Sequence, residues 1–423
     1  MLKKRISFLI IALLILTLSV SVFAQEKIQL RVSWWGSETR HQATLDAIAL
    51  YEELNPHVDI IPEYSGFEGF RNKLFSQVMA GNAPDIFTTV MEWYPDLRDA
   101  DAMVDITGMV DVSGHNPMYV EACSLDGKMY GVNLSVNGMV LIQNNTLLEK
   151  LGVEPLEAPY TWDEMVAKFQ EVYEKSNGRV YGAPDFTANP EGMGFDIFKY
   201  YGYSVLGYED AFPFDNDKFT INKEDIQSFL QFFADMRETN AIAPVDISAM
   251  NDFSANSLLI QNLTAYEINY AGTFGRYQDQ TTDDLQPLPM PVGPNGESGD
   301  LARPGLIFSV SKNSKHVAEA AKFIDWFTNS PEAAKILKTS RGILPTEVQR
   351  AAMLEAGSEI SAVDEKVMRV MDEILQREFK LAYVGPSGHT EISSIILPEI
   401  SQMIGFGLMT PEEGAEEIMM EIK

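Results

Sequence analysis

Residues 30–41 read Leu-Arg-Val-Ser-Trp-Trp-Gly-Ser-Glu-Thr-Arg-His, and they predict a strand that runs directly into a helix. The alternation of apolar and polar residues up to Trp34 is typical of a half-buried strand. Thr39 and Gln42 predict a capping box that starts the helix, and apolar residues at helical spacing continue it to Leu54. In open α/β sheets, small ligands bind beyond the carboxyl ends of strands. We therefore expect this turn to form one wall of a ligand site.

The residues that follow predict a parallel sheet. Residues 58–64 alternate as a second strand, residues 67–78 carry a helical apolar face, and residues 86–90 form a third strand. This alternation of strands and helices is typical of an α/β domain.

The pattern changes near residue 135. Two short predicted strands, 129–134 and 139–144, flank residues 135–138, where we expect the chain to cross between two parts of the molecule. Strand alternation resumes at residues 306–310, and the chain from residue 346 to its end has a helical pattern. The length of 423 residues favours two or three domains.

Local capping residues predict several further helix starts. Thr161 with Glu164 has the spacing of a capping box, and Asn222 precedes another helical pattern. Ser330 is followed by Pro331, a residue favoured at the first helical position.

The N-terminal residues have the pattern of an export signal. Three basic residues at positions 3–5 precede the apolar run 6–18, and Val22-Phe23-Ala24 fits a signal-peptidase site. An uncleaved membrane anchor is the alternative, but the run is shorter than the roughly 20 apolar residues that a span needs. No cysteine lies near the cleavage point, which argues against a lipoprotein. We expect cleavage after Ala24 and a periplasmic location.

The chain is strongly acidic, with 61 Asp and Glu against 32 Lys and Arg residues and a net charge of −29. Such a surface does not suit nucleic acid or an anionic membrane. An anionic ligand would need local positive charge. Cys123 is the single cysteine, so an intrachain disulfide is impossible.

The sequence lacks the common catalytic and cofactor motifs. It has no H-E-x-x-H, G-x-S-x-G, P-loop or G-x-G-x-x-G element, and its five histidines lack metal-ligand spacing. We therefore predict no catalytic residues, no metal and no cofactor. A secreted glycoside hydrolase or other polysaccharide-active enzyme is the alternative, because 61 carboxylates can include an acid/base pair that a sequence does not reveal.

Several short elements, in a shared order and spacing, resemble one protein family along nearly the whole chain. They are residues 80–86 (AGNAPDI), 126–131 (DGKMYG), 144–152 (NNTLLEKLG), 160–164 (YTWDE), 322–327 (KFIDWF), 330–332 (SPE) and 342–345 (GILP). In these elements the chain is similar to the family 1 extracellular solute-binding proteins of carbohydrate ABC importers, which include maltose-binding proteins. Two positions depart from the family pattern: Asn133 stands where proline is frequent, and Gln143 where tyrosine is frequent.

The resemblance implies a type II-like periplasmic-binding-protein fold, with two α/β lobes, crossing hinge segments and a C-terminal helical region. The lobes would close on a carbohydrate ligand, and the protein would be a non-enzymatic monomer that delivers the ligand to importer permease subunits. After the signal peptide 1–24, we place lobe one at residues 25–136 and 304–342. We place lobe two at residues 137–303 and 343–423.

The turn after the first strand is most similar to the oligogalacturonide-type binders within this family. The similarity lies in Trp34-Trp35-Gly36 followed by Arg40-His41-Gln42, and it implies a ligand that contains uronic acid. Arg40 and His41 also lie in the first helical turn, where the helix dipole disfavours cations. An anionic ligand would explain this placement, and so would a salt bridge to a neighbouring carboxylate.

Sugar receptors need aromatic planes for the C–H faces of the sugar and planar polar groups for its hydroxyls. Strand neighbours point to opposite faces, so we expect Trp35 to stack on the ligand and Trp34 to anchor the core. The resemblance implies further candidates at four places in the chain. They follow the predicted third strand (86–90), lie in the predicted crossover (135–138), follow residues 264–268, or precede the predicted strand 306–310. The complete set of candidate ligand-binding residues is Trp34, Trp35, Gly36, Arg40, His41, Phe67, Glu92, Trp93, Asn137, Asn269, Tyr270, Phe274, Arg303, Gly305 and His389.

Overall fold

The computed structural model describes residues 27–67, 69–188, 193–209, 212–215, 218–251, 257–355, 360–377, 380–381 and 389–422. The predicted signal peptide, residues 1–24, lies outside the described residues. Within the described ranges, no helix has the length and apolar character needed to cross a membrane.

The described residues form strands and helices in the alternation expected for an α/β protein. The strands are β1 (Ile28–Trp35), β2 (Val58–Ser65), β3 (Ile86–Thr89), β4 (Ser124–Leu125), β5 (Lys128–Met129), β6 (Val132–Asn144), β7 (Phe214–Asp215), β8 (Lys218–Phe219), β9 (Tyr266–Tyr270), β10 (Leu285–Pro289), β11 (Leu301–Val310) and β12 (Lys380–Leu381). The helices are α2 (Glu38–Leu54), α3 (Phe70–Met79), α4 (Tyr94–Asp99), α5 (Pro117–Ala122), α6 (Asn145–Leu151), α7 (Trp162–Lys175), α8 (Met193–Ser204), α9 (Lys223–Glu238), α10 (Val245–Ser248), α11 (Phe274–Gln278), α12 (Val317–Asn329), α13 (Pro331–Leu337), α14 (Glu347–Met353), α15 (Ala362–Gln376), α16 (His389–Glu391), α17 (Leu397–Gly405) and α18 (Pro411–Glu421). Single turns of 3₁₀ or π helix are η1 (Met91–Trp93), η2 (Phe186–Ala188), η3 (Ala271–Thr273) and η4 (Ile392–Ile396).

The strand-to-helix unit predicted at the start of the chain is present as β1 and α2. The predicted capping box at Thr39 is wrong, because α2 begins two residues earlier with Ser37 as its N-cap. Ser37 has an extended backbone and its side chain accepts a hydrogen bond from the backbone N–H of Arg40. Gln42 instead donates to Asp46 one turn later, at 2.8 Å. The caps predicted at Thr161, Asn222 and Ser330 are confirmed.

The main sheet has the strand order β10-β6-β11-β3-β1-β2, with β9 paired to β6 and β12 paired to β11. Strand β1 is parallel to β2 and β3, which confirms the predicted parallel arrangement. Strand β11 is antiparallel to both β3 and β6. We call the half that carries β1, β2 and β3 lobe one, and the half that carries β9 and β10 lobe two.

Strand β6 joins the two lobes without a turn. Its residues 132–138 pair with β11, and its residues 139–144 pair with β9 and β10. The prediction of two short strands around residues 135–138 is therefore wrong. The polar residues in this stretch suggest a loop, but the backbone finds partners on both sides, including Ile343, whose carbonyl accepts a 2.7 Å hydrogen bond from the N–H of Val136.

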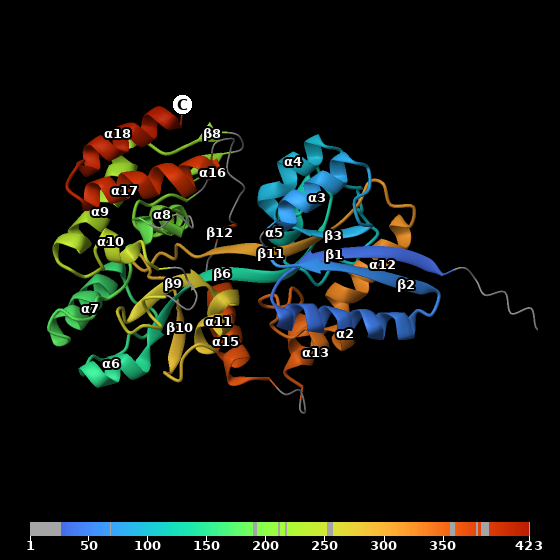
Figure 1. The fold of residues 1–423 in the computed structure, drawn as a ribbon, viewed down its shortest axis with the longest axis horizontal. Coiled ribbons are helices and arrows are strands. Elements are labelled where there is room, and N and C mark those ends of the chain that lie inside the picture. Colours follow the sequence, from blue (N-terminus) through green and yellow to red (C-terminus); the bar gives the residue numbers. More distant parts are fainter. Residues whose placement is uncertain are drawn as a thin grey trace, which may run out of the picture.

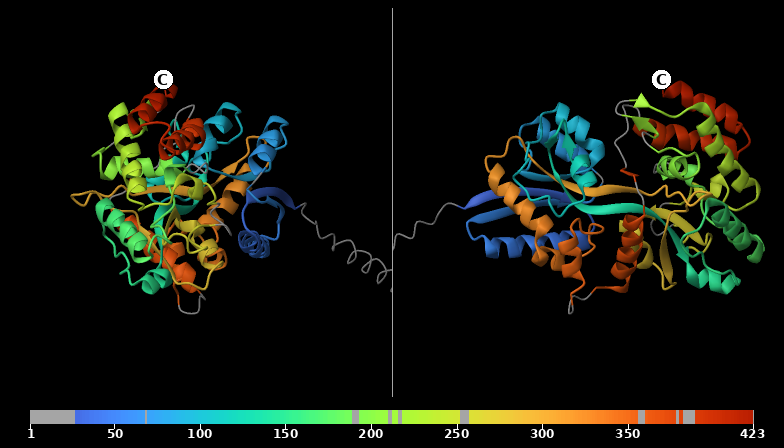
Figure 2. Two further views of the ribbon diagram at one scale, coloured as in Figure 1. Left: turned by 60° about the vertical axis from the view of Figure 1, so that its left-hand side comes forward. Right: turned by 180° about the vertical axis from the view of Figure 1, so that it is seen from behind.

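Helices cover both faces of the sheet in each lobe (Figure 1). In that view α2 and α13 lie below the lobe-one strands and α3 and α4 lie above them; below lobe two are α6, α7, α11 and α15. The C-terminal helices α17 and α18 pack with α9 at the far end of lobe two, as the views in Figure 2 also show. The two-lobed α/β fold with a C-terminal helical region, implied by the resemblance, is confirmed.

Candidate ligand site between the lobes

Aromatic side chains cluster where β1 and β3 end. The Trp35 ring centroid lies 5.2 Å from that of Trp93 and 5.7 Å from that of Phe67. Phe67 and Trp93 are nearly parallel, at 21° and 6.5 Å. Trp35 and Trp93 are buried, whereas Phe67 is 62% exposed. Phe67 is therefore the member of this cluster that offers a free ring face, and the expected stacking role of Trp35 remains a prediction.

Trp34 lies on the opposite face of β1 and is fully buried. Its indole stacks on Tyr64 at 5.0 Å, and its Nε1–H donates a 3.1 Å hydrogen bond to Nδ1 of His41. Nδ1 of His41 is thus an acceptor, so the neutral ring carries its proton on Nε2. Burial and the nearby guanidiniums of Arg40 and Arg341 lower the pKa of His41, although the Glu38 carboxylate opposes them.

Arg40 is held by backbone carbonyls rather than by a carboxylate. Its Nε donates to the carbonyl of Ser340 at 3.0 Å, and one Nη donates to the carbonyl of Trp35 at 3.2 Å. Gly36 makes this possible, because a Cβ at that position would lie 2.4 Å from Cδ of Arg40. Burial, followed by the charge of Arg276, lowers the pKa of Arg40 to about 10.

Two further arginines belong to the same electrostatic environment, and sequence reasoning missed both. Arg341 is buried, hydrogen-bonds to the side chains of Thr44 and Ser340, and places its guanidinium 5.2 Å from the Phe327 ring centroid. Burial and the charge of Arg40 hold the pKa of Arg341 well below its usual value. The exposed Arg276 lies on α11 of lobe two. The sequence around Arg276 and Arg341 has no local pattern that distinguishes them from ordinary surface arginines.

Polar groups from β6 and lobe two also lie where the lobes meet. The half-buried Asn137 on β6 accepts hydrogen bonds through Oδ1 from the N–H groups of Gly272 and Gly138, at 3.1 and 3.2 Å. Among the described residues, no acceptor lies within hydrogen-bond distance of its Nδ2. The hydroxyl of Tyr270 donates to Asp196 at 2.6 Å, and sequence reasoning also missed this aspartate.

Other candidate residues are engaged inside the protein. Asn269 is buried, with its Nδ2 bonded to the hydroxyl of Tyr277 at 2.9 Å, and Phe274 is fully buried in lobe two. A Cβ on Gly305 would lie 2.5 Å from Oγ of Ser135, so this glycine permits close approach of β11 to β6. His389 packs edge-on against two phenylalanine rings of lobe two. The ligand contacts predicted for Asn269, Phe274, Gly305 and His389 stay predictions. The side chains of Glu92 and Arg303 are not among those that the structure describes.

Within the part of the chain that the structure describes, no three His, Cys, Asp or Glu side chains form a group that could hold a metal ion. The interlobe residues are instead aromatic rings, amides, guanidiniums and a phenol that is hydrogen-bonded to the Asp196 carboxylate. These groups can stack against a sugar ring and donate hydrogen bonds to hydroxyl or carboxylate oxygens.

Comparison with known proteins places the chain in a family. Residues 35–334 match the family model described as bacterial extracellular solute-binding protein. The chain belongs to this family. The predicted family resemblance is therefore confirmed, and the family is one of solute-binding rather than enzymatic proteins.

Individual relatives are distant in sequence. A maltotriose-binding protein of Pyrococcus abyssi is 22% identical over 375 residues, which cover 82% of this chain and 77% of that protein. An arabinooligosaccharide-binding protein of Bacillus subtilis is 25% identical, with coverage of 65% and 62%. The solved structure of a periplasmic oligogalacturonide binding protein from Yersinia enterocolitica, in complex with saturated digalacturonic acid, superposes with a TM-score of 0.74 at 23% identity, covering 93% of this chain and 97% of that one.

Proposed function

We propose that this bacterial extracellular solute-binding protein is a saccharide receptor of an ABC importer. The family match over residues 35–334 carries the proposal. The names of the relatives support a sugar as the solute, since they bind maltotriose and arabinooligosaccharides. The aromatic and amide groups between the lobes are of the kind that a sugar requires.

The aromatic cluster supplies the apolar part of the proposed site. Phe67 would receive the C–H face of one sugar ring, backed by the buried indoles of Trp35 and Trp93. The pair of Tyr270 and Asp196, with the Nδ2 donors of Asn137, would bind hydroxyls. Contacts from both lobes would favour the closed arrangement, so the ligand would shift an equilibrium between open and closed forms.

The shared strands suggest how the lobes would move. Strands β6 and β11 run through both halves of the sheet, and Val136 also bridges to Ile343. Small backbone rotations along these segments would rotate one lobe against the other. We propose hinge positions at the boundaries 136/137, 303/304 and 342/343, together with a periplasmic location after cleavage at Ala24, a monomeric state and importer permease subunits as partners.

Calorimetric titration against a panel of neutral and acidic mono- to trisaccharides tests the receptor function. We expect at least one saccharide of the panel to bind. Phe67→Ala should weaken the affinity for that saccharide by about twofold to tenfold, which is the usual contribution of one aromatic contact. Phe406→Ala is the matched control, since Phe406 is 59% exposed but follows α17 at the far end of lobe two.

Two results would contradict the receptor function. One is the absence of binding across the whole panel by a folded protein. The other is release of reducing sugar from polysaccharide fragments, which would instead identify a glycoside hydrolase.

A further inference from the structure

Lys199 on α8 is almost completely buried. It is 6% exposed, and its ammonium lies 5.7 Å from the ring centroid of Phe195 and 5.6 Å from that of Phe214. The ring of His389 packs edge-on against the same two phenylalanines. A buried ammonium is costly unless it is paired and hydrogen-bonded. The position of Lys199 inside this aromatic group therefore depends on a counter-charge.

That counter-charge is Asp196, which lies one turn earlier on α8. Nζ of Lys199 donates to Oδ1 of Asp196 at 2.9 Å, and Oδ2 of the same carboxylate accepts a 2.6 Å hydrogen bond from the hydroxyl of Tyr270. The carboxylate thus lies between the buried ammonium and a partly exposed phenol. An ionised carboxylate accepts hydrogen bonds and has none to donate. The hydrogen of the Tyr270 hydroxyl therefore points toward Asp196.

The direction of this hydrogen bond decides what Tyr270 can offer to a ligand. A hydroxyl group has a single hydrogen, and its lone pairs accept. Because that hydrogen is committed to Asp196, the oxygen of Tyr270 can only accept a hydrogen bond from any other group. A ligand group at this position must therefore be a donor.

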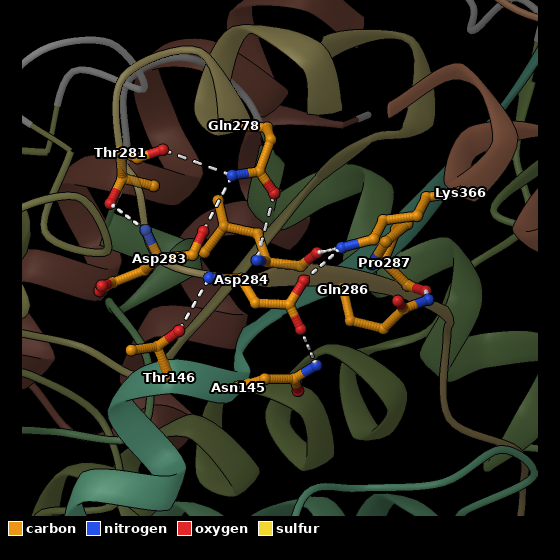
Figure 3. A network of polar contacts seen from close by, with 10 residues as sticks. Asn145, Thr146, Gln278, Thr281, Asp283, Asp284, Gln286, Pro287 and Lys366 are labelled. Atoms are coloured by element: carbon orange, nitrogen blue, oxygen red, sulfur yellow. Dashed lines mark hydrogen bonds and ion pairs between the residues drawn. The ribbon is translucent and has the colours of Figure 1, made fainter. Parts of the chain in front are cut away.

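The backbone that carries Tyr270 is held on both sides of the residue. The N–H of Tyr270 donates to Oδ1 of Asn269 at 2.8 Å, and its carbonyl accepts from the hydroxyl of Thr273 at 2.7 Å. Helix α11, which follows, is anchored by the polar network of Figure 3, in which Gln278 donates to the carbonyl of Asp283 at 2.8 Å. The position of the Tyr270 oxygen is thus set by the protein before a ligand arrives.

Asn137 has the opposite polarity. Its Oδ1 accepts hydrogen bonds from the N–H groups of Gly138 and Gly272, which fixes the orientation of the amide and leaves its donors on Nδ2. A Cβ at Gly272 would lie 3.3 Å from Nδ2, and Gly272 is exposed. This glycine therefore has no side chain to cover the donors, and a ligand group at Asn137 must accept.

Asn137 and Tyr270 lie on the same face of the sheet. Tyr270 pairs with Met139 of β6, two residues after Asn137, and alternate residues of a strand share a face. Helix α8 covers this face in lobe two, on the same side of the sheet as α3 and α4 of lobe one (Figure 1). Phe67 precedes α3 and Trp93 precedes α4, so the donor and the acceptor face the side of the aromatic cluster.

We propose that Lys199 is a positioning residue, which holds the Tyr270 hydroxyl in its accepting direction through Asp196. The receptor then selects a saccharide that donates a hydroxyl hydrogen to Tyr270 and accepts a hydrogen bond from Asn137. This proposal rests on the proposed receptor function and specifies which hydroxyl groups of the ligand must be free. A site that is built to bind a hydroxyl rejects an analogue that lacks the hydrogen, because a polar group of the protein is then left unpaired.

The experiment measures discrimination between a hydroxyl and a fluorine atom by calorimetry. The probes are the panel saccharide that binds and its monodeoxyfluoro analogues, each with one hydroxyl replaced by fluorine, which is similar in size but cannot donate. We expect one analogue to bind about tenfold or more weakly than the parent saccharide, from the cost of one unpaired polar group. Tyr270→Phe should abolish this difference for that analogue and leave the differences for the other analogues unchanged.

Two variants test the role of Lys199. Lys199→Met keeps a long apolar chain between the phenylalanine rings but removes the charge, and Asp196→Asn provides an amide that can donate to the Tyr270 oxygen. Each should reduce the tenfold discrimination to about threefold or less. A purely structural role of Lys199 would weaken the saccharide and its analogue equally and leave their ratio unchanged. Lys168→Met is the matched control, because it removes a lysine–carboxylate pair of the same spacing, with Glu171, on α7.

The outcomes separate this proposal from the receptor function. If a saccharide binds but no fluoro analogue is discriminated, or if the ratio is unchanged in both Lys199→Met and Asp196→Asn, the positioning role is refuted while the receptor function stands. If no saccharide of the panel binds to the folded parent protein, the receptor function fails and this proposal fails with it.

Discussion

Glu267 is a buried carboxyl group whose ionisation should make the stability of the protein depend on pH. The residue lies on β9 and has no exposed surface. Its Oε2 accepts a hydrogen bond from Asn251 at 2.9 Å, and its Oε1 accepts one from the N–H of Ile268 at 3.2 Å. Burial outweighs these two bonds and raises the pKa of Glu267 from 4.5 to about 8. The group is therefore protonated in the folded protein at neutral pH.

The sign of the effect follows from proton linkage. Below about pH 4.5 the carboxyl is protonated in both folded and unfolded chains, so it does not change stability with pH. Between pH 4.5 and about 8 the unfolded chain loses this proton and the folded chain keeps it, so stability falls as pH rises. Each pH unit in this window corresponds to about 1.4 kcal/mol, so the loss from pH 5 to pH 7 is about 2.5 kcal/mol.

Glu267→Gln removes the titrating group while keeping the side-chain shape. The variant loses a fixed amount, about 1 kcal/mol, because its amide cannot accept both hydrogen bonds. Its free energy of unfolding relative to the parent should nevertheless rise by about 2.5 kcal/mol between pH 5 and pH 7. Urea denaturation at pH 5, 6, 7 and 8 measures this difference, provided that the m-value is unchanged.

An exposed carboxylate serves as the control for this experiment. Glu174→Gln in α7 replaces an exposed side chain, and its difference from the parent should be nearly the same at each pH. If the difference between Glu267→Gln and the parent is also constant from pH 5 to pH 7, Glu267 is not protonated in the folded state and the reasoning fails.

Two further predictions concern the crossing strands and the first strand. Gly305→Ala should destabilise the protein by about 1–3 kcal/mol through overpacking, because the new Cβ would lie 2.5 Å from Oγ of Ser135. Adding Ser135→Ala should recover part of that loss in a double-mutant cycle measured by urea denaturation; additive losses would show that the clash is elsewhere. Trp34→Phe removes the donor to Nδ1 of His41, so the pKa of His41 should rise toward its usual value, as followed by NMR titration. An unchanged or lower pKa would mean that this hydrogen bond does not hold the ring neutral.

Local sequence signals predicted the elements that depend on neighbouring residues. Thr161 with Glu164 and Asn222 with Asp225 cap helices as expected, because a cap is a contact across three residues. At the first helix two capping residues compete, and Ser37 rather than Thr39 has the extended backbone that a cap needs. The order of short motifs along the chain was also sufficient to predict the family and its two-lobed fold.

The crossover and the arginine cluster depended on partners that are distant in sequence. Residues 135–138 resemble a loop when considered alone, yet they are strand because β11 and Ile343 supply hydrogen-bond partners from far along the chain. Arg40 contacts Ser340 across 300 residues, and it shares its environment with Arg276 of the other lobe. The sequence alone determined that Arg40 and His41 lie in the first turn of a helix, where the helix dipole disfavours cations. It left two explanations for that placement: an anionic ligand or a salt bridge to a neighbouring carboxylate. The tertiary structure decided against the salt bridge, because among the described residues no carboxylate lies within ion-pair distance of Arg40, whose guanidinium donates to the carbonyls of Ser340 and Trp35.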